Sequence, residues 1–305
     1  MSSPASSAPS THLDTTEIIF SRILVATDFS RIAGNALKLA TEIAQTCGSK
    51  LFVVHAALPI IYGTGGEPAP CEFLDATLES AKIQMKASIE GDPALTALKP
   101  ETIVAYAGAV DLIDMVAKEN KADLIIVGSH GATGLERLAL GSISDTMLRR
   151  ASCPVLVVGP RAHVSQRPFG SIILATDLAT TGLRGAQYAT GLAERYHSKL
   201  TLMHVLGPAF GQIPPEQDAL EENAVAELTR LLPSDISQYC QPKVCVRRGK
   251  PAEEILHVLR SEAASLLVIG VKDHSPLADH AAWSKLSRLV HDAECPVLCV
   301  RAHLA

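Results

Sequence analysis

Short apolar runs alternate with amphipathic stretches through most of the chain. Five runs in the first half are rich in β-branched residues and have the length of buried strands: 22–26, 51–56, 102–105, 124–127 and 155–158. Apolar residues at three-to-four spacing predict helices over about 32–47, 73–89, 111–119 and 142–150. Strands that alternate with helices predict parallel β-α-β crossovers, and hence an α/β sheet with helices on both faces.

Two short polar segments set the ends of the first predicted helix. Ser30 precedes it and is a candidate N-cap, and Gly48 follows it as a candidate C-terminal stop. The Gly/Pro-rich stretch 59–70 is typical of a connection rather than of a helix or strand.

The second half of the chain repeats the first. The segment 171–177 (SIILATD) resembles 22–28 (RILVATD), and in both halves a histidine follows the aspartate at the same interval. The interval from Gly128 to Cys153 also recurs, from Gly270 to Cys295. We therefore predict two copies of one fold, at 18–160 and 169–305, joined by a polar linker at 161–168 and preceded by a disordered tail at 1–17.

Composition excludes several classes of protein. The chain has 305 residues, enough for two ordinary domains, with 47% hydrophobic residues, 19% charged residues and a net charge of −5. No basic stripe indicates a nucleic-acid partner, and no apolar run approaches the roughly 20 residues of a membrane span. The start of the chain lacks the basic and apolar regions of a secretory signal. The seven cysteines include no Cys-x-x-Cys pair and their odd number does not indicate a disulfide framework, so we expect the reducing cytoplasm.

A glycine-containing loop follows the strand at 124–127. Glycines stand at Gly128, Gly131 and Gly141, and Ser142 comes directly before the next predicted helix. Uncovered backbone N–H groups and the positive end of a helix suit an anion such as phosphate. The alternative is that the glycines only make turns and that Ser142 only caps the helix.

The spacing Gly-x2-Gly-x9-Gly-Ser resembles the ATP-binding signature of the universal stress protein family. The words Gly-Ser-His-Gly at 128–131, Leu-Gly-Ser at 140–142 and Cys-Pro-Val at 153–155 resemble that family too. The resemblance covers 18–301. It implies two tandem flavodoxin-like or Rossmann-like domains, each with a five-stranded parallel sheet in the order 3-2-1-4-5.

The resemblance also implies roles for individual residues. Asp28 and Gly128 would contact the ribose, the backbone at Ala56 would hold the adenine, and Gly131, Gly141 and Ser142 would hold the phosphates. The expected ATP contacts are completed by their neighbours Ala26, Thr27, Val127, His130 and Ile143, with His130 and Arg137 placed to reach phosphate oxygens.

Several of these residues have a plainer interpretation. Asp28 could serve only as a residue at a helix entrance, and Arg137 could be a solvated surface residue. For His55, which ends an apolar strand, we favour a packed and hydrogen-bonded role over acid–base chemistry.

The loop lacks the groups that turn nucleotides over. It has no Gly-Lys-Ser/Thr of a P-loop, and no carboxylate pair is evident that would hold Mg²⁺ at an attacking water. We therefore expect a regulatory protein that holds ATP, with or without Mg²⁺, and at most hydrolyses it weakly. The alternatives are a nucleotide-binding enzyme that transfers a phosphoryl or adenylyl group, and an interaction scaffold without a ligand.

The second copy departs from the signature. Asp273 stands in the place of Gly131 and would repel a phosphate, and Trp283 stands in the place of Gly141 and would obstruct a close backbone approach. A metal site at Asp273, His274, Asp279 and His280 lacks tetrahedral ligand spacing, so a solvated loop is favoured.

The last apolar strand of each copy, 155–158 and 297–300, is expected at a sheet edge. An apolar edge strand must be paired or covered, and joining both copies in one chain favours an internal pseudo-dimer. Association of whole chains into a homodimer stays open.

Overall fold

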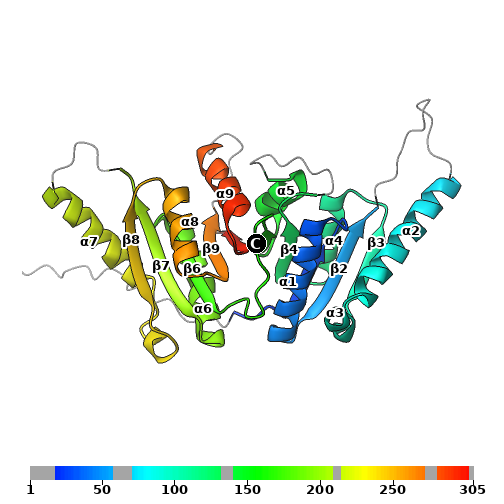
Figure 1. The fold of residues 1–305 in the computed structure, drawn as a ribbon, viewed down its shortest axis with the longest axis horizontal. Coiled ribbons are helices and arrows are strands. Elements are labelled where there is room, and N and C mark those ends of the chain that lie inside the picture. The colour runs from blue at the N-terminus through cyan, green and yellow to red at the C-terminus, as the bar shows by residue number, and fades with distance from the viewer. Residues whose placement is uncertain (1–17, 58–70, 132–139, 209–213, 272–279, 302–305) are drawn as a thin grey trace, which may run out of the picture.

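The chain forms two α/β domains that share one continuous sheet (Figure 1). The computed structural model describes residues 18–57, 71–131, 140–208, 214–271 and 280–301. Within these ranges the sheet has ten strands in the order β3-β2-β1-β4-β5-β10-β9-β6-β7-β8. Each half of that order reads 3-2-1-4-5 from its outer edge, with all pairs inside a half parallel, which confirms the predicted topology.

The first domain contains the strands and helices that the apolar pattern predicts. Its elements are β1 (Arg22–Ala26), α1 (Arg31–Cys47), β2 (Lys50–Ala56), α2 (Cys71–Glu90), α3 (Pro93–Leu98), β3 (Glu101–Ala105), α4 (Ala109–Glu119), β4 (Leu124–Gly128), α5 (Ser142–Arg150) and β5 (Val155–Val158). The short helix α3 was not predicted.

The second domain repeats this order. Its elements are β6 (Ser171–Ala175), α6 (Thr180–Tyr196), β7 (Lys199–Leu206), α7 (Pro214–Arg230), a 3-10 turn η1 (Ile236–Gln238), β8 (Lys243–Arg248), α8 (Pro251–Ser261), β9 (Leu266–Val271), α9 (His280–Asp292) and β10 (Val297–Arg301).

Both expected ends of α1 are confirmed. The Ser30 hydroxyl accepts a hydrogen bond from the N–H of Ala33 at 3.2 Å, so it satisfies one of the free donors of the first turn. Gly48 ends the helix in the left-handed conformation at φ 68°, where a residue without Cβ carries no steric penalty.

Two layers of helices bury the two faces of the sheet. Successive strand residues point to opposite faces, so Ile23 and Val25 join one core while Leu24 joins the other. Residues of α1, α2, α3, α6 and α7 complete the first core, and residues of α4, α5, α8 and α9 complete the second (Figure 1).

The two domains meet through their last strands. β10 pairs with β5 in antiparallel register, with Leu298 opposite Leu156, so the predicted pairing of the two apolar edges within one chain is confirmed. The contact extends beyond the strands: a Cβ on Gly159 would lie 1.9 Å from the carbonyl oxygen of Val290 in α9. The backbone of the second domain can therefore approach this point only because residue 159 has no side chain.

The segment between the domains is also held by contacts. Ala162 is buried, and the N–H of His163 donates to the carbonyl oxygen of Glu294 at 2.9 Å. His163, in the expected linker, thus contacts the second domain. The tail 1–17 and the Gly/Pro-rich connection 59–70 fall outside the described residues.

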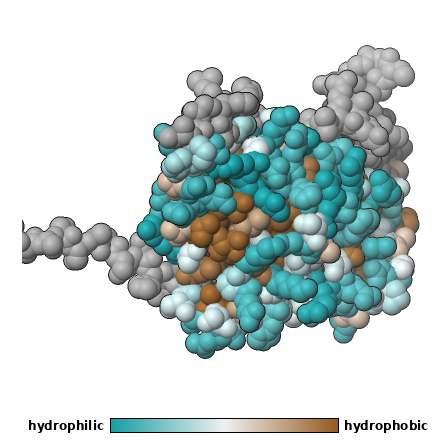
Figure 2. Space-filling model, turned by 60° about the vertical axis from the view of Figure 1, so that its left-hand side comes forward, coloured by the Kyte–Doolittle hydropathy of each residue, from teal (hydrophilic) through white to brown (hydrophobic). Residues whose placement is uncertain are grey.

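The surface of the second domain is mixed in character. Figure 2, which brings that side of the molecule forward, shows a group of hydrophobic side chains within a mainly hydrophilic face. Across the described ranges, no helix is both long enough and apolar enough to span a bilayer.

Candidate functional site

The predicted site residues of the first domain gather at the carboxyl ends of three neighbouring strands. β1 lies between β2 and β4, as the register Val25 with Val53 and with Ile126 shows. Ala26, Thr27 and Asp28 leave β1, Ala56 ends β2, and Val127 with Gly128 ends β4. This is the end of a parallel sheet at which ligands bind, beside the point where the strand order reverses.

A tight turn after β1 orients Asp28. The Thr27 hydroxyl accepts from the N–H of Phe29, and the Asp28 carboxylate accepts from the N–H of Ser30, both at 3.0 Å. Phe29 adopts φ 62°, a left-handed conformation that is uncommon for a residue other than glycine. The turn therefore fixes the aspartate at the entrance of α1, where the helix dipole favours its negative charge.

His55 has a structural role. Its Nδ1 lies 2.8 Å from the carbonyl oxygen of Thr27, and its ring packs on Phe29 with the ring centroids 4.4 Å apart. The imidazole thus connects the end of β2 to the turn after β1, and the packed interpretation of this histidine is confirmed.

Gly131 lies directly over the carboxylate of Asp28. A Cβ at this glycine would stand 2.7 Å from Oδ2 of Asp28, closer than two such atoms can pack. The two residues, which are far apart in the sequence, are therefore neighbours only because residue 131 carries no side chain. This contact joins the β1 end of the site to the loop after β4.

Gly141 brings the start of α5 against the same loop. Its N–H donates to the carbonyl oxygen of Ser129 at 2.7 Å, and a Cβ there would lie 3.0 Å from that oxygen and 3.3 Å from Cα of His130. Gly141 occupies the N-cap position and has no side chain with which to cap the helix. The first N–H groups of α5, at Ser142 and Ile143, thus receive no hydrogen bond from their N-cap residue, and such groups suit an external acceptor.

Ser144 is a further positioning residue that the sequence did not reveal. Its buried hydroxyl donates towards the carbonyl oxygens of Gly128, at 2.9 Å, and Ser129, at 3.1 Å. This clamp fixes the distance between α5 and the end of β4. The only sequence signal is that the equivalent residue of the second copy, Leu286, has no hydroxyl group and cannot form these hydrogen bonds.

His130 lies between the two glycine contacts. Its Nδ1 is 3.0 Å from the hydroxyl of Ser129. The backbone N–H of Ser129 in turn donates to the carbonyl oxygen of Val158. Arg137 and the rest of 132–139 lie outside the described residues.

A pocket of about 510 Å³ opens beside Asp28, on the α2 side of the sheet. Asp28, Phe29, His55 and Ala56 border it, together with residues of α2 that include Thr77 and Gln84. None of the three glycines is among its lining residues. The predicted set is thus divided into a pocket side and an α5 side, which meet at the contact between Asp28 and Gly131.

The second domain keeps the first half of this arrangement. Nδ1 of His204 lies 2.8 Å from the carbonyl oxygen of Thr176, and the Asp177 carboxylate accepts from the N–H of Ala179 at 3.0 Å. Leu178 adopts φ 61°. The turn after β6 therefore reproduces the turn after β1 almost bond for bond.

The other half differs, for a reason that the sequence reading did not give. α9 begins at His280, whereas α5 begins only at Ser142, the equivalent of Ser284. The N–H at Ser284 therefore lies inside a helix, where it bonds to the preceding turn. The indole of Trp283 packs under the guanidinium of Arg149, 4.0 Å from the ring centroid, and Trp283 also lines a pocket of the second domain, so its expected obstruction of a phosphate stays a prediction. Asp273, His274 and Asp279 lie outside the described residues.

Comparison with known proteins identifies the family. The model of the universal stress protein family matches the chain twice, at 20–159 and 168–301. The chain belongs to the universal stress protein family. A universal stress protein of Mycolicibacterium smegmatis is 27% identical over 297 residues, which cover 92% of this chain and 96% of that protein. One from Thermus aquaticus is 37% identical over 142 residues, which cover 46% of this chain and 99% of that protein.

Solved structures agree on the fold. The crystal structure of a universal stress protein from Archaeoglobus fulgidus superposes with a TM-score of 0.68 at 18% identity, covering 93% of this chain and 97% of that one. Its agreement extends over both halves of this universal stress protein, so the tandem α/β architecture is shared.

Proposed function

We propose that the first domain of this universal stress protein binds ATP at the carboxyl ends of β1, β2 and β4. The observation that carries the proposal is the convergence of Asp28, Gly131 and the start of α5, whose N-cap residue Gly141 has no side chain. A carboxylate suits the hydroxyl groups of a ribose, and free backbone N–H groups at a helix start suit phosphates.

The residues present fit ATP in their chemistry. Gly131 and Gly141 carry no Cβ, so the Asp28 carboxylate and the loop at Ser129 can approach them closely, which brings the carboxylate and the start of α5 together. Asp28 is held by the hydrogen bond that its carboxylate accepts from the N–H of Ser30, and a carboxylate is an acceptor that suits the hydroxyl groups of a ribose. The backbone at Ala56, which borders the pocket beside Asp28, is the proposed contact for the adenine.

We expect the nucleotide to be held rather than turned over. The loop from Gly128 to Ser142 contains no lysine to draw charge from the β- and γ-phosphates. Asp28 is the carboxylate of the proposed contact set, and a single carboxylate does not build a two-metal site. Any Mg²⁺ would therefore arrive with the phosphates of ATP.

The biological proposal follows from the family. We propose a cytoplasmic regulatory protein of the stress response, in which ATP occupancy of the first domain determines what the paired domains present to a partner. The pairing of β5 with β10 gives the two domains the relation of a pseudo-dimer.

Nucleotide analysis tests the proposal. The protein is purified without added nucleotide, denatured, and the released compounds are identified by mass; we expect ATP. The purified protein is then incubated with ATP and Mg²⁺, and we expect release of phosphate far slower than one turnover per second, below ordinary enzyme rates. Absence of any nucleotide, together with no binding of added ATP, would favour the ligand-free scaffold, and rapid turnover would favour the enzyme.

A further inference from the structure

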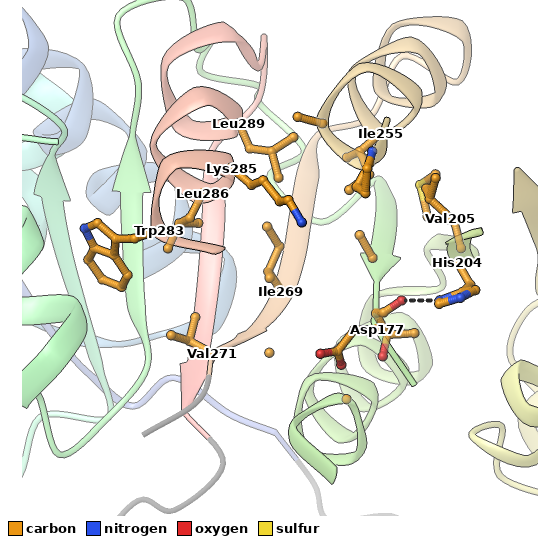
Figure 3. Close-up of a pocket in the computed structure, with 17 residues that line it drawn as sticks. Asp177, His204, Val205, Ile255, Ile269, Val271, Trp283, Lys285, Leu286 and Leu289 are labelled. Carbon is orange, nitrogen blue, oxygen red and sulfur yellow. Dashed lines mark hydrogen bonds between the residues drawn. The ribbon is translucent and has the colours of Figure 1, made fainter. Parts of the chain in front are cut away.

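The second domain contains a pocket of its own, of about 390 Å³, at the carboxyl ends of β6, β7 and β9 (Figure 3). Its size is within the range of sites for small organic ligands. The sheet contributes Ala175, Met203 and Ile269, and α8 and α9 contribute Ile255 and Leu289, among others. The walls are therefore mainly aliphatic, and residues of α8 and α9 border the pocket beside the sheet.

One cation, the exposed Lys285, stands at the border of this apolar space. Lys285 borders the pocket from α9, and Figure 3 shows its ammonium group directed between Leu289, Ile255 and Ile269. Within the described residues Lys285 makes no ion pair that would occupy its charge. The equivalent position in the first domain is Ile143, so the charge is particular to the second domain.

The opposite end of the pocket carries acceptor groups. The carboxylate of Asp177 faces the pocket below Ile269 in Figure 3, and Thr176 is among the residues that line the pocket. A ligand that spans the pocket thus meets a cation at one end and a hydrogen-bond acceptor at the other, with aliphatic side chains between them.

The pocket is not arranged for a triphosphate. α9 begins one turn earlier than α5, so the N–H of Ser284 is used within the helix. Leu286 replaces the Ser144 clamp of the first domain with an apolar wall. In place of the helix start of the first domain, this pocket offers a single lysine. The charge of Lys285 matches a ligand with one negative charge but not a polyphosphate.

We propose that the second-domain pocket binds a mainly apolar carboxylic acid, with its single negative charge at Lys285 and a hydroxyl or N–H group at Asp177. A nucleoside monophosphate does not share this chemistry, because its phosphate carries about two negative charges near pH 7 and its ribose is polar. The inference does not depend on ATP binding in the first domain.

The probes are 2-naphthoate, its neutral isostere 2-naphthamide, and AMP, titrated by calorimetry into the full-length protein. We expect 2-naphthoate to bind more tightly than AMP, whose phosphate carries about two charges, and tighter binding of AMP would overturn the proposal. The amide should bind about tenfold more weakly than the acid, because one charge-assisted contact is lost.

Two variants assign the binding to this pocket. Lys285→Gln should weaken the anionic probe about tenfold and leave the amide unchanged. The matched control is Lys199→Gln, an exposed lysine at the opposite end of β7, which should change neither affinity. Ala252→Met places a longer side chain at the pocket wall and should weaken both probes, with the thermal unfolding midpoint showing that the fold is kept.

The proposal is overturned if no probe binds at about 1 mM, if acid and amide bind equally well, or if Lys285→Gln leaves the affinity for the anion unchanged. ATP affinity is measured on the same proteins. If the wild-type protein does not bind ATP, only the first-domain proposal fails, because Lys285 is not among the residues assigned to the ATP site.

Discussion

Substitution of Gly131 by alanine should weaken ATP binding through Asp28. The added Cβ would stand 2.7 Å from Oδ2 of Asp28, well inside the ~3.5 Å at which such atoms are in favourable contact. Gly131 does not have a positive φ, so alanine is compatible with the backbone and the collision is the whole perturbation.

The carboxylate is at the end of a rotatable side chain, so it should move rather than unfold the domain. Moving it breaks the 3.0 Å bond from the N–H of Ser30, at a cost of about 1 kcal/mol in the free energy of unfolding. It also removes a charge-assisted contact to the ribose, of about 1.5–3 kcal/mol, which corresponds to a roughly 10-fold to 100-fold loss of ATP affinity.

The assay is calorimetric titration of ATP into the full chain, with Gly34→Ala as the matched control. A Cβ at Gly34, in α1 close to the same turn, meets nothing within 4 Å. This control should keep the wild-type affinity and raise the stability by about 0.5–1 kcal/mol, because alanine replaces glycine within a helix.

A double-mutant cycle shows whether the effect passes through the carboxylate. If it does, Asp28→Ala and Gly131→Ala should each weaken binding, and the double variant should be little worse than Asp28→Ala alone. Wild-type affinity in Gly131→Ala, or fully additive losses, would refute the reasoning.

Three further predictions concern the pairing of the domains and the buried thiols. Gly159→Ala should lower the free energy of unfolding in urea by at least about 1–3 kcal/mol, since its methyl group would lie 1.9 Å from the backbone oxygen of Val290; an unchanged midpoint would contradict the contact. Arg149→Ala should shift the emission of Trp283, the one tryptophan of the chain, to longer wavelength, because the indole loses the guanidinium that covers it. Burial raises the pKa of the Cys153 thiol from 9.0 to about 12. The stabilisation that comes from the buried, protonated thiol is therefore present in full below pH 9.0 and is lost as the pH rises towards 12. A free energy of unfolding that stays constant across this pH range would contradict the prediction.

Much of the fold could be predicted because the strand signals are strong. Each central strand is a short apolar run buried on both faces, and the repeat of 22–28 at 171–177 fixes the tandem organisation. The helix α3 was missed because it has only six residues, although Asp92 as its N-cap and Pro93 in its first turn are usual start signals.

The site was predictable only where a residue type is itself the signal. Glycines at 131 and 141 indicated a close backbone approach, and the structure shows which atoms approach. The early start of α9 was not foreseen, although Ala281 and Ala282 are strong helix formers and Trp283 replaces the glycine that serves as the N-cap of α5. The clamp by Ser144 and the direction of Lys285 depend on packing between elements, which no local pattern encodes.

The measurement that tests the central claim most directly is the stoichiometry of ATP binding to the full chain and to Gly141→Trp, which gives the first domain the residue of the second. The account predicts one ATP per wild-type chain, and no measurable binding by the variant with its circular dichroism nearly unchanged, because the indole would displace the loop at Ser129 from the start of α5. Two ATP per wild-type chain, or wild-type affinity in Gly141→Trp, would contradict it.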